Sequence, residues 1–159
     1  MNTKIIQEEA EAIGESFIVS LALQDFSQIE SIFDPQVRFR ALVPARLCEG
    51  KTAGEATGWL RRWFGDADEI LELQSVANQV FDRLHLSYRL RVHDVINGWR
   101  VIEQQAYGSL QGGQVSDLWL VCSGFRPDPG FLPLQPSAGG QSQRAVSTDV
   151  QARPSVDIY

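Results

Sequence analysis

The stretch LALQDFSQIESIFDPQVRFRA, residues 21 to 41, contains the end of one helix, a second short helix and the start of a strand. Phe26, Ile29 and Phe33 recur at the spacing that places side chains on one side of a helix. Asp34-Pro35 ends this helix, because proline disfavours helical geometry in the residue before it. The stretch therefore predicts two helices followed directly by a strand.

Residues 36 to 43, QVRFRALV, alternate in the manner of a β-strand. One face would carry Val37, Phe39 and Ala41, and the other Arg38, Arg40 and Leu42. Upstream, residues 3 to 24 carry apolar residues at helical spacing. Downstream, Thr52-Ala53-Gly54-Glu55 is a capping-box pattern that opens another helix, and Gly65 stands where a left-handed C-terminal cap is expected.

The next part of the chain has the pattern of consecutive antiparallel strands. Four strand-like segments follow the helices, at residues 69–80, 84–95, 99–110 and 114–124. Asn97-Gly98 and Gly112-Gly113 are typical of tight two-residue hairpin connections. Helices at the start and a run of hairpins afterwards predict an α+β fold.

Composition limits the function classes. The chain has 159 residues, 43% of them hydrophobic, and a formal net charge of −6. Excess negative charge argues against nucleic acid and anionic membranes as partners, and no apolar run has the length of a membrane helix. Cys48 and Cys122 have no metal or redox spacing, so we expect free thiols and a cytoplasmic protein.

The chain is expected to form one domain, residues 1–126. From Pro127 onward it is rich in Pro, Gly, Ser and Gln and has no sustained period. Residues 127–159 are therefore expected to form a disordered tail, because their composition offers little apolar surface to bury.

The order of elements resembles the nuclear transport factor 2-like superfamily, which includes the SnoaL-like proteins. The resemblance rests on DFSQIESIFDPQVRF, on the helix ending in RRWFG, and on the strands LHLSYRLRV, WRVIEQQAYG and SDLWLVCSGF, and it covers roughly residues 5 to 126. It implies a cone, in which a curved antiparallel sheet wraps around three N-terminal helices and leaves an internal pocket. Members include ketosteroid isomerases, scytalone dehydratase, limonene epoxide hydrolase and polyketide cyclases, besides proteins that only bind or dimerise.

Two-residue loops would fix which side chains share a face. They predict that Glu103, Gln105 and Tyr107 pair with Val92, Leu90 and Tyr88 on one side and with Cys122, Leu120 and Leu118 on the other. Glu103 would then lie inside, within an apolar face, and Gln104 outside. A bulge or a three-residue loop in either hairpin would exchange the faces of one strand.

Glu103 is the candidate acid or base, because burial among apolar side chains should raise the pKa of a carboxyl. Gln105 would orient a substrate, Tyr107 would contact its far end, and the Tyr88 hydroxyl could stabilise an oxyanion. Alternatively, Glu103 is a structural partner of Arg38 or Arg40, because buried ion pairs also perturb a pKa.

The remaining candidates would line the pocket or the outer face. Trp63, Arg38, Arg40, Leu90, Leu120 and Cys122 are expected to contact a substrate. A metal site is not expected, since His85 and His93 have no ligands at suitable spacing. A homodimer is expected through the convex sheet face, at Ile102, Ala106, Trp119 and Val121.

These residues support two hypotheses. The first is a protein that binds an apolar small molecule and that, if it is an enzyme, is a cofactor-independent isomerase, dehydratase or cyclase that uses Glu103. The second is a non-catalytic binding or dimerisation module. A permanent arginine partner for Glu103 and a filled interior would favour the second.

Overall fold

A computed structural model describes residues 3–128, which form an α+β domain. Its helices are α1 (Thr3–Ala22), α2 (Phe26–Ile32) and α3 (Ala53–Phe64). Its strands are β1 (Phe33–Val43), β2 (Arg46–Gly50), β3 (Glu69–Val80), β4 (Arg83–Asp94), β5 (Gly98–Gln111), β6 (Gln114–Cys122) and β7 (Arg126–Pro127). The predicted tail falls almost wholly outside the described residues. Within them, no helix is both long enough and apolar enough to cross a bilayer.

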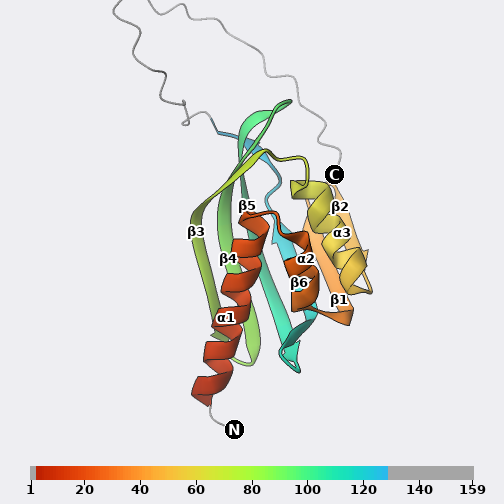
Figure 1. Cartoon of the computed structure of the whole chain (residues 1–159), viewed down its shortest axis with the longest axis vertical. Helices are drawn as coiled ribbons and strands as arrows, with labels where there is room; N and C mark the ends of the chain where they lie inside the picture. Colours follow the sequence, from red (N-terminus) through yellow and green to blue (C-terminus); the bar gives the residue numbers. More distant parts are fainter. Residues whose placement is uncertain (1–2, 129–159) are drawn as a thin grey trace, which may run out of the picture.

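The strands form one curved sheet in the order β2-β1-β6-β5-β4-β3, and β7 adds to β5 (Figure 1). All neighbours are antiparallel except β1 and β6, which run parallel. The sheet is therefore mostly antiparallel rather than wholly so. The helices share one side of it: α1 packs on β3 and β4, while α3 packs on β1, β2 and α2.

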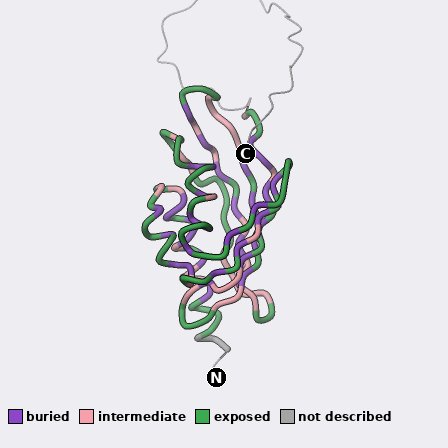
Figure 2. Tube along the Cα trace, turned by 90° about the vertical axis from the view of Figure 1, so that its right-hand side faces the viewer, coloured by how far each residue is buried: buried purple, intermediate pink, exposed green. Residues whose placement is uncertain are grey.

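The core lies between the helices and the inner, helix-facing side of the sheet. Buried residues alternate with exposed ones along the central strands, as Figure 2 shows. The largest fully buried side chains are Phe33, Phe39, Phe64, Ile18, Leu21, Ile29, Leu60, Leu86, Leu90, Ile102, Leu118 and Leu120. Burial of this apolar surface is the main favourable contribution to folding.

The helix signals are confirmed with one correction. The Thr52 side chain accepts a hydrogen bond from the Glu55 N–H, as in a capping box. Gly65 does end α3, but its φ of −67° is right-handed, so the expected left-handed cap is wrong. Glycine is favoured there for another reason: an added Cβ would lie 2.4 Å from the Arg61 carbonyl oxygen.

Strand β2 has no counterpart in the sequence prediction. It pairs with the end of β1, and Cys48 of β2 lies opposite Ala41. Its residues, RLCEG, are few and mixed in polarity. Edge strands this short carry too little periodic signal to be recognised alone.

The turn between β4 and β5 differs from the expected two-residue loop. Asp94 pairs with Gly98, so Val95, Ile96 and Asn97 form a three-residue loop. The Asp94 carboxylate accepts hydrogen bonds from the backbone N–H groups of Ile96 and Asn97, and Gly98 adopts a φ of +70°, which favours glycine. The three-residue length of this turn therefore depends on the Asp94 hydrogen bonds as well as on the Asn-Gly pair.

The turn between β5 and β6 is the predicted one, but the strands then slip by one residue. Gln111 pairs with Gln114 around Gly112-Gly113, whereas Ser109 pairs with Asp117 beyond a bulge. Ser116 is the extra residue there, and its hydroxyl donates to the Ser109 carbonyl.

Both irregularities act on β5, whose two faces are exchanged relative to the prediction. Tyr88 lies opposite Gln104, and Arg89 lies opposite Glu103. The predicted inner faces of β4 and β6 are confirmed, because Leu90, Leu120 and Cys122 are buried. The inner face of β5 instead carries Ile102, Gln104 and Ala106.

Candidate functional site

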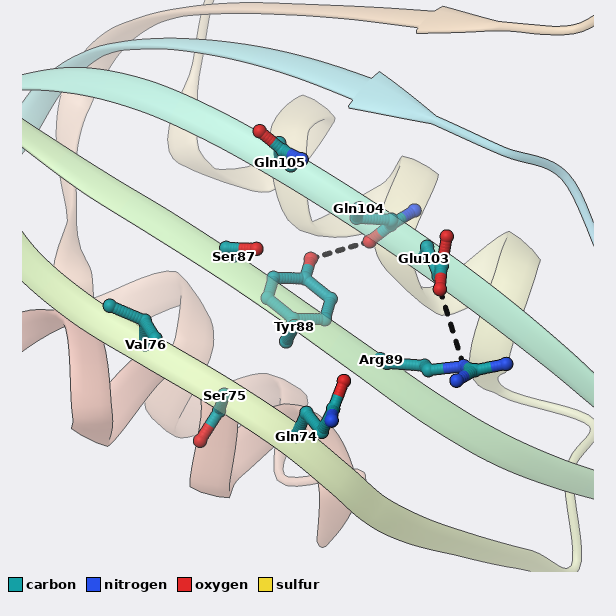
Figure 3. A pocket seen from close by; sticks show the side chains of 9 residues that line it. All are labelled: Gln74, Ser75, Val76, Ser87, Tyr88, Arg89, Glu103, Gln104 and Gln105. Atoms are coloured by element: carbon teal, nitrogen blue, oxygen red, sulfur yellow. Dashed lines mark hydrogen bonds and ion pairs between the residues drawn. The ribbon is translucent and has the colours of Figure 1, made fainter.

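Glu103 lies on the outer face of the sheet, so its predicted burial is wrong. Its side chain is 60% exposed and forms an ion pair with Arg89, with 3.2 Å between Oε1 and Nε (Figure 3). The partner is the cross-strand neighbour and neither Arg38 nor Arg40. A carboxylate in water beside an arginine lacks the enclosed, apolar surroundings that were expected to make Glu103 an acid or base.

The other predicted polar candidates also lie outside. Gln105 is exposed, and Tyr107 is stacked on His85 with ring centroids 4.8 Å apart. Arg40 lies over the Trp119 ring, at 3.4 Å from its centroid, and 3.8 Å from Asp117. Arg38 is exposed on the same face. Their expected positions inside the cone are therefore wrong.

The inner face carries a different polar pair, Tyr88 and Gln104. The Tyr88 hydroxyl donates a hydrogen bond of 2.5 Å to the Gln104 amide oxygen, and both side chains are buried (Figure 3). Phe17 of α1 packs on the Tyr88 ring, with centroids 6.3 Å apart. The pair thus lies beneath a helix, in the apolar core.

Cys122 lies next to this pair, because it is the β6 partner of Gln104. Burial raises the pKa of its thiol, whereas hydrogen bonds from the Gln104 side chain and the Gly124 N–H act to lower it. Burial also holds the pKa of Tyr88 well above its ordinary value. Tyr88, Gln104 and Cys122 therefore form an uncharged polar cluster at neutral pH.

Several polar atoms of this interior lack a hydrogen-bond partner within residues 3–128. They are Trp63 Nε1, Thr57 Oγ1 and Gln104 Nε2, the last of which has only the weakly accepting Cys122 sulfur beside it, and all three side chains are nearly inaccessible to solvent. Buried polar groups are normally paired, since an unmade hydrogen bond costs about 1–3 kcal/mol. The sequence prediction that Trp63 faces a ligand site stays a prediction, supported by its unpaired N–H.

A buried carboxylate does occur, at Asp94, near one end of the inner face. It accepts hydrogen bonds from Asn97 and from the turn backbone, and Arg100 Nη2 lies 2.8 Å from its Oδ2. Burial acts to raise the pKa of Asp94, but these hydrogen bonds and the Arg100 charge together lower it. Asp94 is thus a stable anion that organises the turn, and not a proton donor near neutral pH.

No group of three or more His, Cys, Asp or Glu side chains within the described residues could hold a metal ion. Depressions do occur on the outer surface. One of about 450 Å³ is lined by Gln74, Ser75, Val76, Ser87, Tyr88, Arg89, Glu103, Gln104 and Gln105 (Figure 3). It lies over β3, β4 and β5, and the Arg89–Glu103 ion pair is part of its lining.

The outer face also carries an apolar strip. Its exposed members are Leu42, Leu47, Tyr107, Trp119 and Val121. The register makes them neighbours, because Leu42 pairs with both Leu47 and Val121, and Tyr107 pairs with Trp119. Ile102 and Ala106 are buried inside, so half of the predicted dimer surface is wrong.

Gln104 is the residue that the sequence prediction missed. The pattern of β5 itself contained the signal: Ile102, Gln104 and Ala106 are a more apolar set than Glu103, Gln105 and Tyr107. The predicted register instead relied on two-residue loops at Asn97-Gly98 and Gly112-Gly113, and it therefore placed the less apolar set inside. In the structure the hydrophobic pattern decides the register.

Comparison with known proteins shows the fold. No model of a known protein family matches the chain, and a search of curated proteins finds no match. Among solved structures, an LEH-like epoxide hydrolase of M. tuberculosis has a TM-score of 0.56 at 12% identity, over 74% of this chain and 84% of that one.

Two further structures agree. A protein with a ketosteroid isomerase-like fold from Catenulispora acidiphila, in complex with trimethylamine, has a TM-score of 0.58 at 9% identity, over 70% and 85% of the chains. An NTF2-like protein of Burkholderia xenovorans has a TM-score of 0.56 at 8% identity, over 74% and 91%. The predicted nuclear transport factor 2-like fold is confirmed, and at these identities the likeness concerns the fold alone.

Proposed function

We propose that this chain, which has the nuclear transport factor 2-like cone fold, binds an apolar small molecule against the inner face of its sheet. The observation that carries the proposal is the buried Tyr88–Gln104 pair, whose amide nitrogen meets no oxygen or nitrogen acceptor in the described structure and has beside it the weakly accepting sulfur of Cys122. Ligand sites are mostly apolar and hold a few well-placed polar groups, which is the composition of this interior.

Acid–base catalysis by Glu103 is not part of this proposal. The exposed ion pair with Arg89 meets one of the two criteria, an arginine partner for Glu103, that favour a non-catalytic module. Asp94 is held as an anion by its turn, and the Tyr88 phenol is held neutral. Binding, rather than proton transfer by a carboxylate, is what these residues support.

The test compares two variants by native mass spectrometry and thermal shift with a library of apolar compounds. The double variant Tyr88→Phe/Gln104→Leu replaces both partners by apolar side chains of similar shape, which is often nearly neutral for stability. It should lose the bound ligand or its thermal shift, whereas Glu103→Gln should keep both. Loss of binding in Glu103→Gln with retention in the double variant would overturn the proposal.

A second proposal is that two copies associate through the apolar strip of Leu42, Leu47, Tyr107, Trp119 and Val121. Single exposed apolar residues are ordinary, but contiguous exposed patches mark interaction surfaces. An antiparallel sheet face is compatible with a two-fold axis, because the same strip would serve both copies. The Arg89–Glu103 ion pair beside the strip would form part of the polar rim of this interface.

A further inference from the structure

Strand β3 forms one edge of the sheet (Figure 1), and its outward side has no partner within residues 3–128. It is twelve residues long and pairs with β4, and among these residues it makes no backbone hydrogen bond to any other element. The opposite edge strand, β2, has only five residues. Because an edge strand presents a row of N–H and C=O groups, β3 can pair with a further strand along its outward side.

The usual protections of an edge strand are sparse on β3. None of its residues is buried, whereas alternate residues of β4 are. Its two charged residues, Glu69 and Glu72, stand near its start, and a bulge at Leu73 follows them. Residues 74–80, QSVANQV, contain no charge, proline or glycine, and Val76 is 49% exposed. Proteins normally interrupt such an edge with charges or proline, or cover it with another part of the chain.

The described part of the chain ends at a fixed point near this edge. The Asp128 N–H donates to the Trp99 carbonyl on β5, and the Asp128 carboxylate lies 2.6 Å from Arg91 Nε on β4. Neighbouring strands are about 4.8 Å apart, so about 15 Å separates Asp128 from the outward side of β3. Residues 129–143 can span up to about 50 Å. A segment that begins at residue 144 can therefore reach either end of β3.

One segment beyond Asp128 has the composition of a strand. Residues 141–153, QSQRAVSTDVQAR, are the longest run after Pro127 without proline or glycine. Three β-branched residues alternate there with smaller or polar ones: Val146, Thr148 and Val150. The run has two arginines and one aspartate, whereas the charged residues of β3 are both glutamates. Its pattern fits a sheet edge, and its net charge is opposite to that of β3.

We propose that residues 144–151 bind to β3 as an added strand of the sheet. Their backbone pairs with the outward N–H and C=O groups of residues 74–80, and the face with the β-branched residues turns toward the side that α1 covers. The connection through residues 129–143 makes this pairing intramolecular, which raises the local concentration of the segment at the edge. The added strand protects β3 from edge-to-edge association with other chains.

This inference is independent of the ligand site and of the apolar strip, because β3 contributes no residue to the Tyr88–Gln104 pair or to the strip. It restricts the sequence expectation of a disordered tail to the residues outside 144–151. The segment, rather than a second copy of the chain, is the occupant that the tether and the charges favour.

The test measures backbone hydrogen exchange by NMR on the full chain and on two double variants. N–H groups alternate in direction along a strand, so one of two consecutive residues must donate to β3. Ser147→Pro/Thr148→Pro therefore removes a pairing donor whichever the register. The matched control, Ser142→Pro/Gln143→Pro, places the same change just outside the segment. All four positions lie beyond Asp128, so the domain itself keeps its sequence.

The amides of residues 74–80 that do not pair with β4 should exchange slowly in the unmodified chain and in the control. In Ser147→Pro/Thr148→Pro they should exchange at least about tenfold faster, while the amides of β5 keep their rates. Equal rates in all three proteins, or fast exchange at this edge in the unmodified chain, would overturn the proposal. Slow exchange that is lost on dilution would also overturn it, because the edge would then be covered by a second copy.

Discussion

Tyr88 and Gln104 lie directly opposite each other on β4 and β5, and the tyrosine hydroxyl donates a 2.5 Å hydrogen bond to the amide oxygen. This pair, and not the neighbouring carboxylate of Glu103, is the polar centre of the inner face. Each partner satisfies one atom of the other, while the amide nitrogen has no oxygen or nitrogen acceptor among the described residues and lies beside the Cys122 sulfur. The pair therefore contributes to stability and to the proposed site together.

Removing the Tyr88 hydroxyl should lower stability and change its dependence on alkaline pH. Tyr88→Phe leaves the Gln104 oxygen unpaired, at a cost of about 1–3 kcal/mol in the free energy of unfolding. Burial raises the folded-state pKa of Tyr88. The associated stability is present below the unfolded pKa of about 10 and is lost as pH rises toward the folded pKa.

Urea unfolding between neutral pH and strongly alkaline pH measures both effects. The loss of stability above about pH 10 should be smaller in Tyr88→Phe than in the unmodified chain. Tyr107→Phe, at an outer tyrosine, serves as the control and should leave the alkaline profile unchanged. Identical alkaline profiles for all three proteins would show that Tyr88 is not buried.

Neutralising Glu103 should have little effect on the free energy of unfolding or on ligand binding. Glu103→Gln removes an ion pair whose two side chains are 60% and 46% exposed, and such surface pairs contribute about 0–1 kcal/mol. Urea unfolding and ligand thermal shifts should both stay close to those of the unmodified chain. A loss of several kcal/mol, or loss of ligand binding, would show that Glu103 has the internal role that the sequence suggested.

Asp94→Asn should weaken the β4–β5 hairpin in a pH-dependent manner. The carboxylate accepts from Asn97, Ile96 and Arg100, so the variant should lose about 1–3 kcal/mol at neutral pH. The folded-state pKa of Asp94 is lowered, since these partners outweigh the effect of burial. Its contribution is therefore present above about pH 3.9 and is lost as pH falls through the folded pKa.

Acid unfolding of the two proteins measures this difference, which should shrink as pH falls below about 3.9. Asp82→Asn is a suitable control, because Asp82 is an exposed residue within another hairpin turn, between β3 and β4. A constant gap between Asp94→Asn and the unmodified chain at every pH would contradict the assigned role of the Asp94 charge.

Val121→Arg should separate the proposed dimer. Val121 is 57% exposed and lies opposite Leu42 in the apolar strip. It is a cleaner site than Trp119, since a new arginine there would face Arg40, which now packs on the indole. Sedimentation equilibrium should show at least a tenfold weaker dimer, from placing a charge in an apolar contact. Gln74→Arg, outside the strip, should dimerise normally; an unmodified chain that sediments as a monomer would refute this interface.

Much of the fold could be predicted because its signals are local. The period of α1, the cap at Thr52 and the alternation of β1 each depend on residues close in sequence. The predicted strands at 69–80, 84–95, 99–110 and 114–124 correspond closely to β3, β4, β5 and β6. Hydrophobic periodicity gives an element and its extent without knowledge of its neighbours.

The site could not be predicted because it depends on the register between strands. A three-residue loop after Asp94 and a bulge at Ser116 each displace β5, and a displacement of one residue exchanges its faces. The loop is held by the Asp94 carboxylate, which also accepts a hydrogen bond from Arg100 on the facing strand, a contact that turn statistics do not include. The polar residue of β5 that faces the interior is therefore Gln104, one residue along the chain from the predicted Glu103.

The most direct test of the central claim is the side-chain amide signal of Gln104 in a ¹⁵N-labelled sample, assigned by its absence in Gln104→Leu. Binding against the inner face predicts that acetophenone, used as an apolar probe, shifts the Gln104 amide protons, because the few polar groups of an apolar site lie in contact with its ligand. The side-chain amides of Gln74 and Gln105, on the outer depression, should stay in place. Shifts of Gln74 and Gln105 with an unchanged Gln104 would contradict the claim and assign binding to the outer face.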